Sequence, residues 1–122
     1  MSNTVTRKGK EILVQITETS VSSSTEETIT LGITKGRILR QTCVKTSGSG
    51  STVDPILTRT SGGSGVDIVM ENATAAATVD NQVTGGVPFY TSDGVLYHKS
   101  SPDSASNNAV SSEYLILVGW GE

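Results

Sequence analysis

The sequence predicts an all-β domain, an antiparallel β-sandwich of about eight short strands. Apolar residues recur in short alternating runs, and clusters of Ser, Thr, Gly, Asn and Asp separate these runs at a spacing typical of sandwiches and barrels. No stretch has the apolar periodicity of a helix of normal length. Charged residues make up only 17% of the chain, which disfavours charge-driven disorder, and 122 residues correspond to a single domain.

The N-terminal part of the chain is expected to divide at residue 10. Residues 1–10 are polar and show no periodicity, so we expect a flexible arm that becomes ordered on its partners. The sandwich domain then spans 11–122. Its first strand, 11–19, alternates between an apolar face that carries Ile12, Val14 and Ile16 and a second, more polar face.

A β-hairpin is expected over 36–59, the stretch around which the sequence is organised. Residues 37–46 are rich in β-branched and aliphatic side chains, the breaker cluster 47–51 follows, and 53–60 is extended again. Pro55 has no backbone N–H to donate, so the return strand is expected to lie at a sheet edge or to carry a bulge.

The second half of the chain continues in the same style. A second hairpin is expected over 89–99, because Asp93-Gly94 is a tight-turn pair between two apolar runs. Residues 72–78 contain four alanines but are short and lie between strands, so we expect an irregular segment or a brief helical turn. The most hydrophobic run predicts a strand that is buried on both faces. The expected strands are 11–19, 28–33, 37–46, 53–60, 66–71, 83–90, 95–99 and 113–120.

The charge of the chain argues against nucleic acid as the main partner. The net charge is −3, whereas a phosphate footprint needs clustered Lys and Arg. Arg7, Lys8 and Lys10 are candidate contacts to an acidic partner, although a run of this kind is more often a solvated tail. We expect no membrane partner and no signal peptide, because the start is polar and no apolar run reaches the ~20 residues of a membrane helix.

No constellation of residues predicts an enzyme, a metal site or a cofactor site. His98 is the only histidine, and no Gly-x-Ser-x-Gly elbow opens a helix, so no catalytic residue is expected. His98 is instead expected to be a polar or interfacial strand residue. A zinc site needs more ligands than His98 and Cys43 supply, and Cys43 lies in an apolar run as a small buried hydrophobe would. The acidic residues lie near turns, which explains them better than calcium binding does.

Exposed aromatic residues would be the mark of a carbohydrate site on a small β-sandwich, because sugars stack on aromatic rings. Tyr90, next to the Asp93-Gly94 turn, is the one aromatic residue well placed to be exposed and is the candidate glycan contact. Tyr97, Tyr114 and Trp120 lie within or beside apolar strands, so we expect them to be core or interface anchors.

Three features together resemble small accessory proteins of tailed-phage virions. They are the Ser/Thr/Gly-rich composition with little Cys, the stretches RQTCVKTSGSGSTVDPIL and VPFYTSDGVLYHK, and the final strand YLILVGW. The resemblance covers residues 32–120 and is to capsid decoration (cement) proteins and fibre or knob domains. It implies a jelly-roll-like sandwich that is made in the host cytoplasm, binds the major capsid protein on the outside of a phage head as a homotrimer or other homo-oligomer, and stabilises that head.

Other functions remain open from the sequence. The main alternative is a receptor- or carbohydrate-binding sandwich of a phage fibre or spike, with Tyr90 as its glycan contact. Another structural module, such as a tail or adhesin domain, comes next, and an enzyme would depend on His98. The sequence does not decide between a jelly roll and an immunoglobulin-like sandwich, because alternation patterns do not encode strand order; the resemblance favours the jelly roll.

Overall fold

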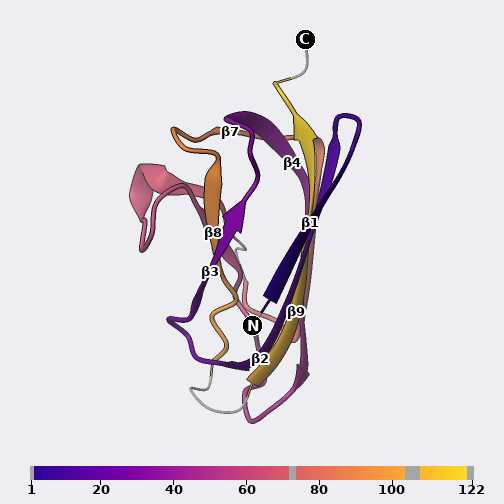
Figure 1. Cartoon of the computed structure of the whole chain (residues 1–122). Coiled ribbons are helices and arrows are strands. Elements are labelled where there is room, and N and C mark those ends of the chain that lie inside the picture. The colour runs from indigo at the N-terminus through magenta and orange to yellow at the C-terminus, as the bar shows by residue number, and fades with distance from the viewer. Residues whose placement is uncertain (1, 72–73, 104–107, 121–122) are drawn as a thin grey trace.

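The computed structural model describes residues 2–71, 74–103 and 108–120 and contains two packed antiparallel sheets, so the predicted all-β sandwich is confirmed (Figure 1). The strands are β1 (Ser2–Lys8), β2 (Glu11–Val21), β3 (Glu26–Thr30), β4 (Lys35–Ser47), β5 (Ile56–Thr58), β6 (Ile68–Glu71), β7 (Thr78–Tyr90), β8 (Val95–Lys99) and β9 (Asn108–Val118). A short 3-10 turn, η1 (Gly65–Asp67), precedes β6. Within the described residues, no helix is long and apolar enough to cross a membrane.

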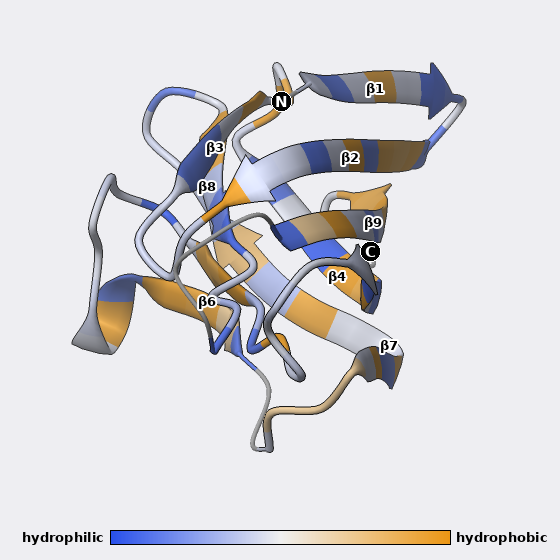
Figure 2. Cartoon of the chain, turned by 90° about the horizontal axis from the view of Figure 1, so that it is seen from below, coloured by the Kyte–Doolittle hydropathy of each residue, from blue (hydrophilic) through white to orange (hydrophobic). Residues whose placement is uncertain are grey.

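The strand order is that of a jelly roll. One sheet has the order β1-β2-β9-β4-β7, which Figure 2 shows side by side, and the other has the order β3-β8-β5-β6. The antiparallel pairs β2–β9, β3–β8, β4–β7 and β5–β6 are nested. The chain therefore behaves as one long antiparallel ribbon, folded back near η1 and wrapped so that successive strand pairs alternate between the two sheets.

Both predicted hairpins are wrong. In each case the two strands lie in different sheets: β4 and β7 belong to the five-stranded sheet, whereas β5 and β8 belong to the four-stranded sheet. The loop after β4 crosses between the layers and is held by the Val53–Ala76 bridge. Gly94 lies in the connection from β7 to β8 and does not close a hairpin. Its carbonyl instead accepts a hydrogen bond from Leu31 N, in the β3–β4 connection, at 2.8 Å.

The ends of several strands differ from the prediction. β7 begins at Thr78 rather than at residue 83, and β9 spans Asn108–Val118 rather than 113–120. β9 is not buried on both faces: Tyr114 is buried, whereas Glu113 is exposed. β5 is an interior strand, so the sheet edge expected from Pro55 is wrong, whereas the alternative of a bulge agrees with the register shift between Leu57 and Thr58 in the pairing with β6. Residues 74–77 are irregular as expected, and 72–73 lie outside the described residues.

The expected arm, residues 1–10, differs most from its prediction. Residues 2–8 form β1, which pairs with β2 in unbroken register from Ser2↔Thr17 to Lys8↔Glu11. Val5 packs against the core, and Asn3 Nδ2 donates to Thr28 O at 3.0 Å. β1 is therefore part of the sandwich, and the domain boundary expected at residue 11 does not separate it from the sheet. Flexibility of this segment stays a prediction.

The core lies between the sheets and consists of buried apolar residues from strands of both sheets. Ile12, Ile38 and Ile116 lie side by side in the register of β2, β9 and β4, and none is more than 1% exposed. Gly36 lets Phe89 pack closely on β4, because a Cβ at this position would lie 2.8 Å from Leu117 O and from the Phe89 ring.

Asp103 fastens the β4–β5 crossover to the segment after β8. Its carboxylate accepts from Ser51 Oγ and Ser51 N, both at 2.7 Å, and from Thr52 N at 3.2 Å. The Ser51 hydroxyl and these backbone N–H groups lower the pKa of Asp103 from 3.8 to about 2.

Replacing Asp103 should reveal a stability contribution that depends on pH. The folded-state pKa of Asp103 is lowered, so its contribution is present above pH 3.8 and is lost as the pH falls towards 2. We expect Asp103→Ala to lower the free energy of unfolding at pH 7, and the difference from wild type to shrink between pH 4 and pH 2. Urea unfolding across this range measures it, and a difference that is independent of pH would contradict the assignment.

Candidate partner-binding surface

One end of the sandwich carries the three basic residues that the sequence singles out. Arg7 and Lys8 end β1, and Lys10 follows in the turn to β2. Gly9 has a φ of +62°, a conformation that favours glycine and allows this tight turn. Arg7 Nε donates to Gly9 O at 3.0 Å, and all three basic side chains are exposed.

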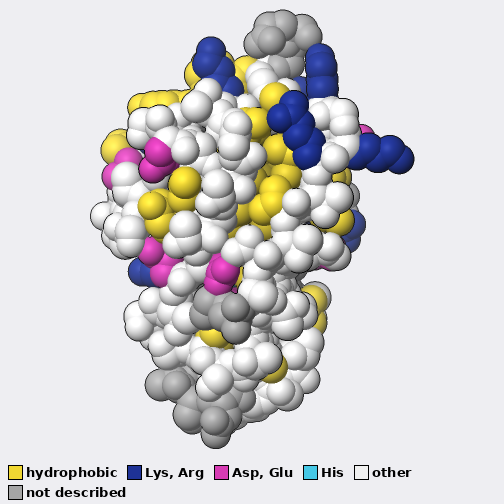
Figure 3. Space-filling model, viewed as in Figure 1, with side chains coloured by type: hydrophobic (Ala, Val, Ile, Leu, Met, Phe, Trp, Pro, Cys, Tyr) yellow, Lys and Arg dark blue, Asp and Glu magenta, His cyan; other side chains and the backbone are white. Residues whose placement is uncertain are grey.

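The sheet brings two further basic residues to the same end. Lys10 O accepts from Val118 N at 2.8 Å, and Lys35 O accepts from Gly119 N at 3.0 Å, so the end of β9 lies between them. Arg37 is opposite Leu117 and half-buried. We call the five residues Arg7, Lys8, Lys10, Lys35 and Arg37 the basic end. In Figure 3, Lys and Arg side chains gather at the top, the end at which Figure 1 shows the β1–β2 turn.

Trp120 lies at the basic end and is exposed. Its indole Nε1 donates to Phe89 O at 2.8 Å, and Lys35 Nζ is 4.9 Å from the ring centroid. The side chain is 46% exposed, so Trp120 is not a core anchor, and its expected role as an interface anchor stays a prediction. It is exposed because β9 ends at Val118 and Gly119, with a φ of +82°, turns the chain out of the sheet. An indole with an open surface next to cations is a common anchor in protein interfaces.

The charge of the molecule is unevenly distributed. The basic end holds five of the nine Lys and Arg residues of a chain whose net charge is −3. Glu11 is the acidic residue that the register of the five-stranded sheet places among them. This end therefore fits an acidic partner, and contacts made by such exposed charges weaken as salt is added.

Tyr90 lies beside a shallow hollow. It is 55% exposed, as expected, and Arg59 Cζ is 4.6 Å from its ring centroid. The hollow has a volume of about 230 Å³ and is also lined by Thr60, Asp67, Thr91 and Ser92. Asp67 Oδ1 is 4.0 Å from Arg59 Nη2. An aromatic ring beside a carboxylate, a guanidinium and hydroxyl groups could bind a sugar; the role of Tyr90 as a glycan contact stays a prediction.

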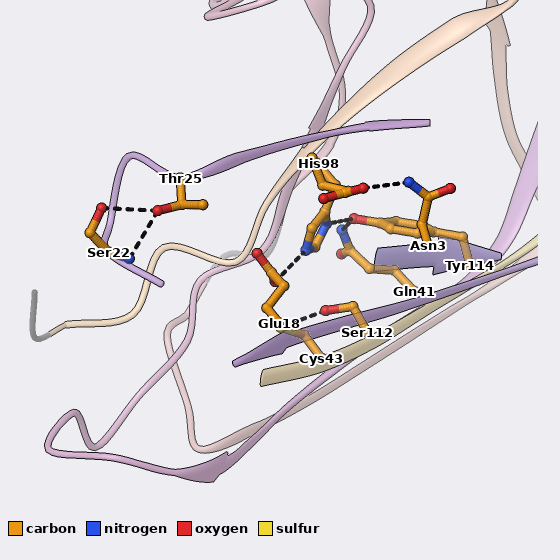
Figure 4. Close-up of polar contacts among 10 residues, drawn as sticks. Asn3, Glu18, Ser22, Thr25, Gln41, Cys43, His98, Ser112 and Tyr114 are labelled. Atoms are coloured by element: carbon orange, nitrogen blue, oxygen red, sulfur yellow. Dashed lines mark hydrogen bonds and ion pairs between the residues drawn. The ribbon is translucent and has the colours of Figure 1, made fainter. Parts of the chain in front are cut away.

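His98 lies in a buried polar cluster that joins the two sheets (Figure 4). It is a strand residue as expected, but it is completely buried in the core, so it does not lie at an exposed interface of this chain. Its Nδ1 is 2.6 Å from Tyr114 Oη, and its Nε2 is 3.6 Å from Glu18 Oε1. His98 comes from β8, whereas Tyr114 and Glu18 come from β9 and β2 in the opposite sheet.

The hydrogen bonds of this cluster run in one direction. Asn81 Nδ2 donates to Gln41 Oε1 at 3.0 Å, and Gln41 Nε2 donates to Tyr114 Oη at 2.9 Å. Since the Tyr114 oxygen accepts from Gln41, its proton can be donated to His98 Nδ1, and the proton of a neutral imidazole ring is then on Nε2, facing Glu18. The hydrogen bonds thus end at His98, whose Nε2 faces Glu18 Oε1 at 3.6 Å, beyond hydrogen-bond distance.

The cluster is closed to solvent, since the side chains of His98, Gln41, Glu18 and Tyr114 are all less than 2% exposed. Burial raises the pKa of Tyr114 above its ordinary value and raises the pKa of Cys43 to about 12, so both keep their protons at neutral pH. Cys43 is buried as expected and accepts from Ser112 Oγ at 3.3 Å. Among the described residues, no three His, Cys, Asp or Glu side chains are grouped to hold a metal ion. The expectation that the protein is not an enzyme stays a prediction.

Comparisons with known proteins give similarity in fold without a family. No family model and no curated protein matches the sequence. A chain of the cyanophage Pam1 capsid asymmetric unit is similar in structure, with a TM-score of 0.45 and 11% identity over 95% of this chain and 86% of that chain. A chain of a Nora virus structure is similar with a TM-score of 0.37 and 7% identity, over 99% of this chain and 62% of that chain. The function is therefore argued from the residues of this chain.

Removing the Tyr114 hydroxyl should destabilise the sandwich. Tyr114→Phe would leave Gln41 Nε2 and His98 Nδ1 buried without this partner, so we expect the free energy of unfolding to fall by about 1–3 kcal/mol. The matched control is Tyr97→Phe, at a half-buried position of β8, with an expected change below about 0.5 kcal/mol. Urea denaturation measures both. Equal effects of the two substitutions would show that the cluster contributes nothing special.

Proposed function

We propose that this protein is a virion structural protein, a decoration protein that binds the outside of a phage head. The observation that carries the proposal is the basic end. Four of its five basic side chains are exposed, and one of them, Lys35, lies over the exposed Trp120. The proposed partner is the major capsid protein, with an acidic surface that the basic end contacts.

The mechanism of stabilisation would be mass action. A protein that binds the closed shell and not its dissociated subunits shifts the equilibrium towards the shell, whatever the affinity of each single contact. Charged contacts orient the protein as it approaches, and Trp120 would supply apolar area that is buried on contact. No residue of the chain needs to react for this role.

A receptor- or carbohydrate-binding role on a fibre or spike is the second candidate function. The hollow at Tyr90 favours it, because the ring is exposed and polar groups that could bind sugar hydroxyls surround it. The ring face near Arg59 is occupied by the guanidinium, so a sugar would stack on the opposite face.

Copy number in purified particles tests the proposed function directly. We expect copies in the hundreds, in simple ratio to the major capsid protein, by quantitative mass spectrometry of particles from the source. A handful of copies per particle would favour the fibre or spike role and direct a glycan search to Tyr90. Absence from particles would refute both.

Charge reversal at the basic end should weaken binding to the capsid. Deleting residues 2–10 would remove β1 from the sheet, so we prefer the double substitution Lys8→Glu/Lys10→Glu at two exposed positions. Replacing two interfacial cations with carboxylates should weaken binding about tenfold or more at low salt. At high salt the difference from wild type should be smaller, because salt screens exposed charges. Co-sedimentation with undecorated particles measures it.

The matched control is Lys45→Glu/Lys99→Glu, which makes the same change in net charge away from the basic end. Lys45, on β4, lies opposite Val110 of β9, and Lys99, on β8, lies opposite Ile56 of β5. Both are half-buried, so circular dichroism must first show that this double variant is folded. If both double variants weaken binding equally, net charge decides the affinity and the basic end is not the contact surface.

A further inference from the structure

In the part of the chain that the structure describes, the sandwich has four edge strands, and three of them are protected. An edge strand leaves half of its backbone N–H and C=O groups without a strand partner, and proteins block such edges with bulges, Gly, Pro, charges or covering segments. The edges here are β1 and β7 in the five-stranded sheet and β3 and β6 in the four-stranded sheet.

β7 is blocked by irregular backbone. Its pairing with β4 shifts register between Ile38 and Arg40, and Gly85 and Gly86 have φ values of +80° and +83°. Pro88 removes one more donor. A regular strand cannot continue along this edge.

The edges of the smaller sheet are short and covered. β3 has five residues, begins with Glu26 and Glu27, and receives the side chain of Asn3, which donates to Glu27 Oε1 and to Thr28 O. β6 has four residues and lies against β7.

β1 is the least protected of the four edges, because it has no bulge, Gly or Pro and its charges are confined to one end. Its seven residues keep one register with β2 and include no Gly, Pro or acidic residue. Its only charges, Arg7 and Lys8, are at one end, and the side chains of 2–6 are uncharged. Because Asn3 ties β1 to β3 and Val5 packs on the core, the strand is held in place with its outer side free to pair.

We propose that β1 pairs antiparallel with β1 of a second copy of this chain, about a two-fold axis at Val5. This joins the two five-stranded sheets into one continuous sheet by β-augmentation. The contact is isologous, so it closes at two copies. The inference goes beyond the proposed function, because it specifies a dimer interface for the homo-oligomer that the resemblance in sequence implies.

The charges of β1 favour this arrangement. Antiparallel pairing centred on Val5 places Lys8 opposite Ser2 of the second copy and Arg7 opposite Asn3 of the second copy. Parallel pairing in register would place Arg7 opposite Arg7 and Lys8 opposite Lys8, and like charges directly opposite each other are destabilising. The antiparallel register also separates the two Lys8 positions by about 20 Å along the joined strands. The two basic ends would therefore lie on opposite sides of the axis, where one dimer could contact two acidic surfaces at once.

Charge pairs at Thr4 and Thr6 test the proposed register. Both side chains are exposed on the outer face of the sheet, and Thr4 would lie opposite Thr6 of the second copy. Thr4→Lys/Thr6→Lys and Thr4→Glu/Thr6→Glu each create two like-charge pairs across the axis and should raise the dimer dissociation constant about tenfold or more. Thr4→Glu/Thr6→Lys creates two opposite-charge pairs at the same positions and should leave the dimer at least as stable as in wild type.

Sedimentation velocity of the purified full chain reads out the mass, and circular dichroism checks that each variant is folded. Wild type and the Glu/Lys variant should sediment at twice the chain mass of 12.7 kDa, and the Lys/Lys and Glu/Glu variants at the single chain mass. A monomeric or trimeric wild type, or a dimer that none of the variants changes, overturns the proposal. These results need no particles, so the interface can fail while the copy number in virions still supports the proposed function.

Discussion

The fold depends on the position of β9 between β2 and β4. This strand is hydrogen-bonded on both sides, and its register aligns Ile116 with Ile12 on one side and with Ile38 on the other. Residues from the start, the middle and the end of the chain must therefore meet before the centre of the five-stranded sheet exists. Such long-range pairing has a large loop-closure cost and makes folding slow. The other nested pairs build outward from this one towards the fold-back at η1.

The sequence predicts the strands far better than their partners. Alternation in 11–19 predicts which side chains face the core, and β2 buries the expected Ile12, Val14 and Ile16. Strand order is not contained in alternation, so a Gly-containing loop between two strands predicts a hairpin even where, as here, the loop crosses between the sheets. β1 escapes prediction because its single apolar residue, Val5, gives no visible period, and pairing with β2 supplies the order that the pattern lacks.

The candidate surface is predictable only in the part that is local in sequence. Arg7, Lys8 and Lys10 are neighbours along the chain, whereas Lys35 and Trp120 join them through the registers of β4 and β9. The buried cluster does leave a signal in the sequence. Glu18 continues the inward positions that begin at Ile12, and His98 continues those of Leu96, so both polar side chains have to enter the core. A polar side chain that is buried without a polar partner costs free energy, so the Glu18 and His98 side chains on facing sheets are expected to lie together.

Net charge alone gives a misleading picture of the partner. A chain of net charge −3 would be repelled by an acidic surface if its charge were evenly spread. Here five of the nine basic residues lie at one end. When this end is within about 8 Å, one Debye length, of an acidic surface, its charges dominate the interaction, because salt screens the more distant charges of the molecule. An acidic surface would attract the protein in one orientation and repel the others.

Two-fold pairing through β1 would give a dimer with two basic ends, which could link two acidic surfaces. The two basic ends of a dimer point in opposite directions, so each can contact an acidic surface of its own. Once one end is bound, the other is held at a high effective concentration near a neighbouring site, which strengthens binding without any new kind of contact. A dimer that spans two neighbouring subunits opposes their separation, whereas a monomer bound to one subunit does not, so the charge separation within one fold and the pairing of one edge strand together suit the stabilisation of a shell.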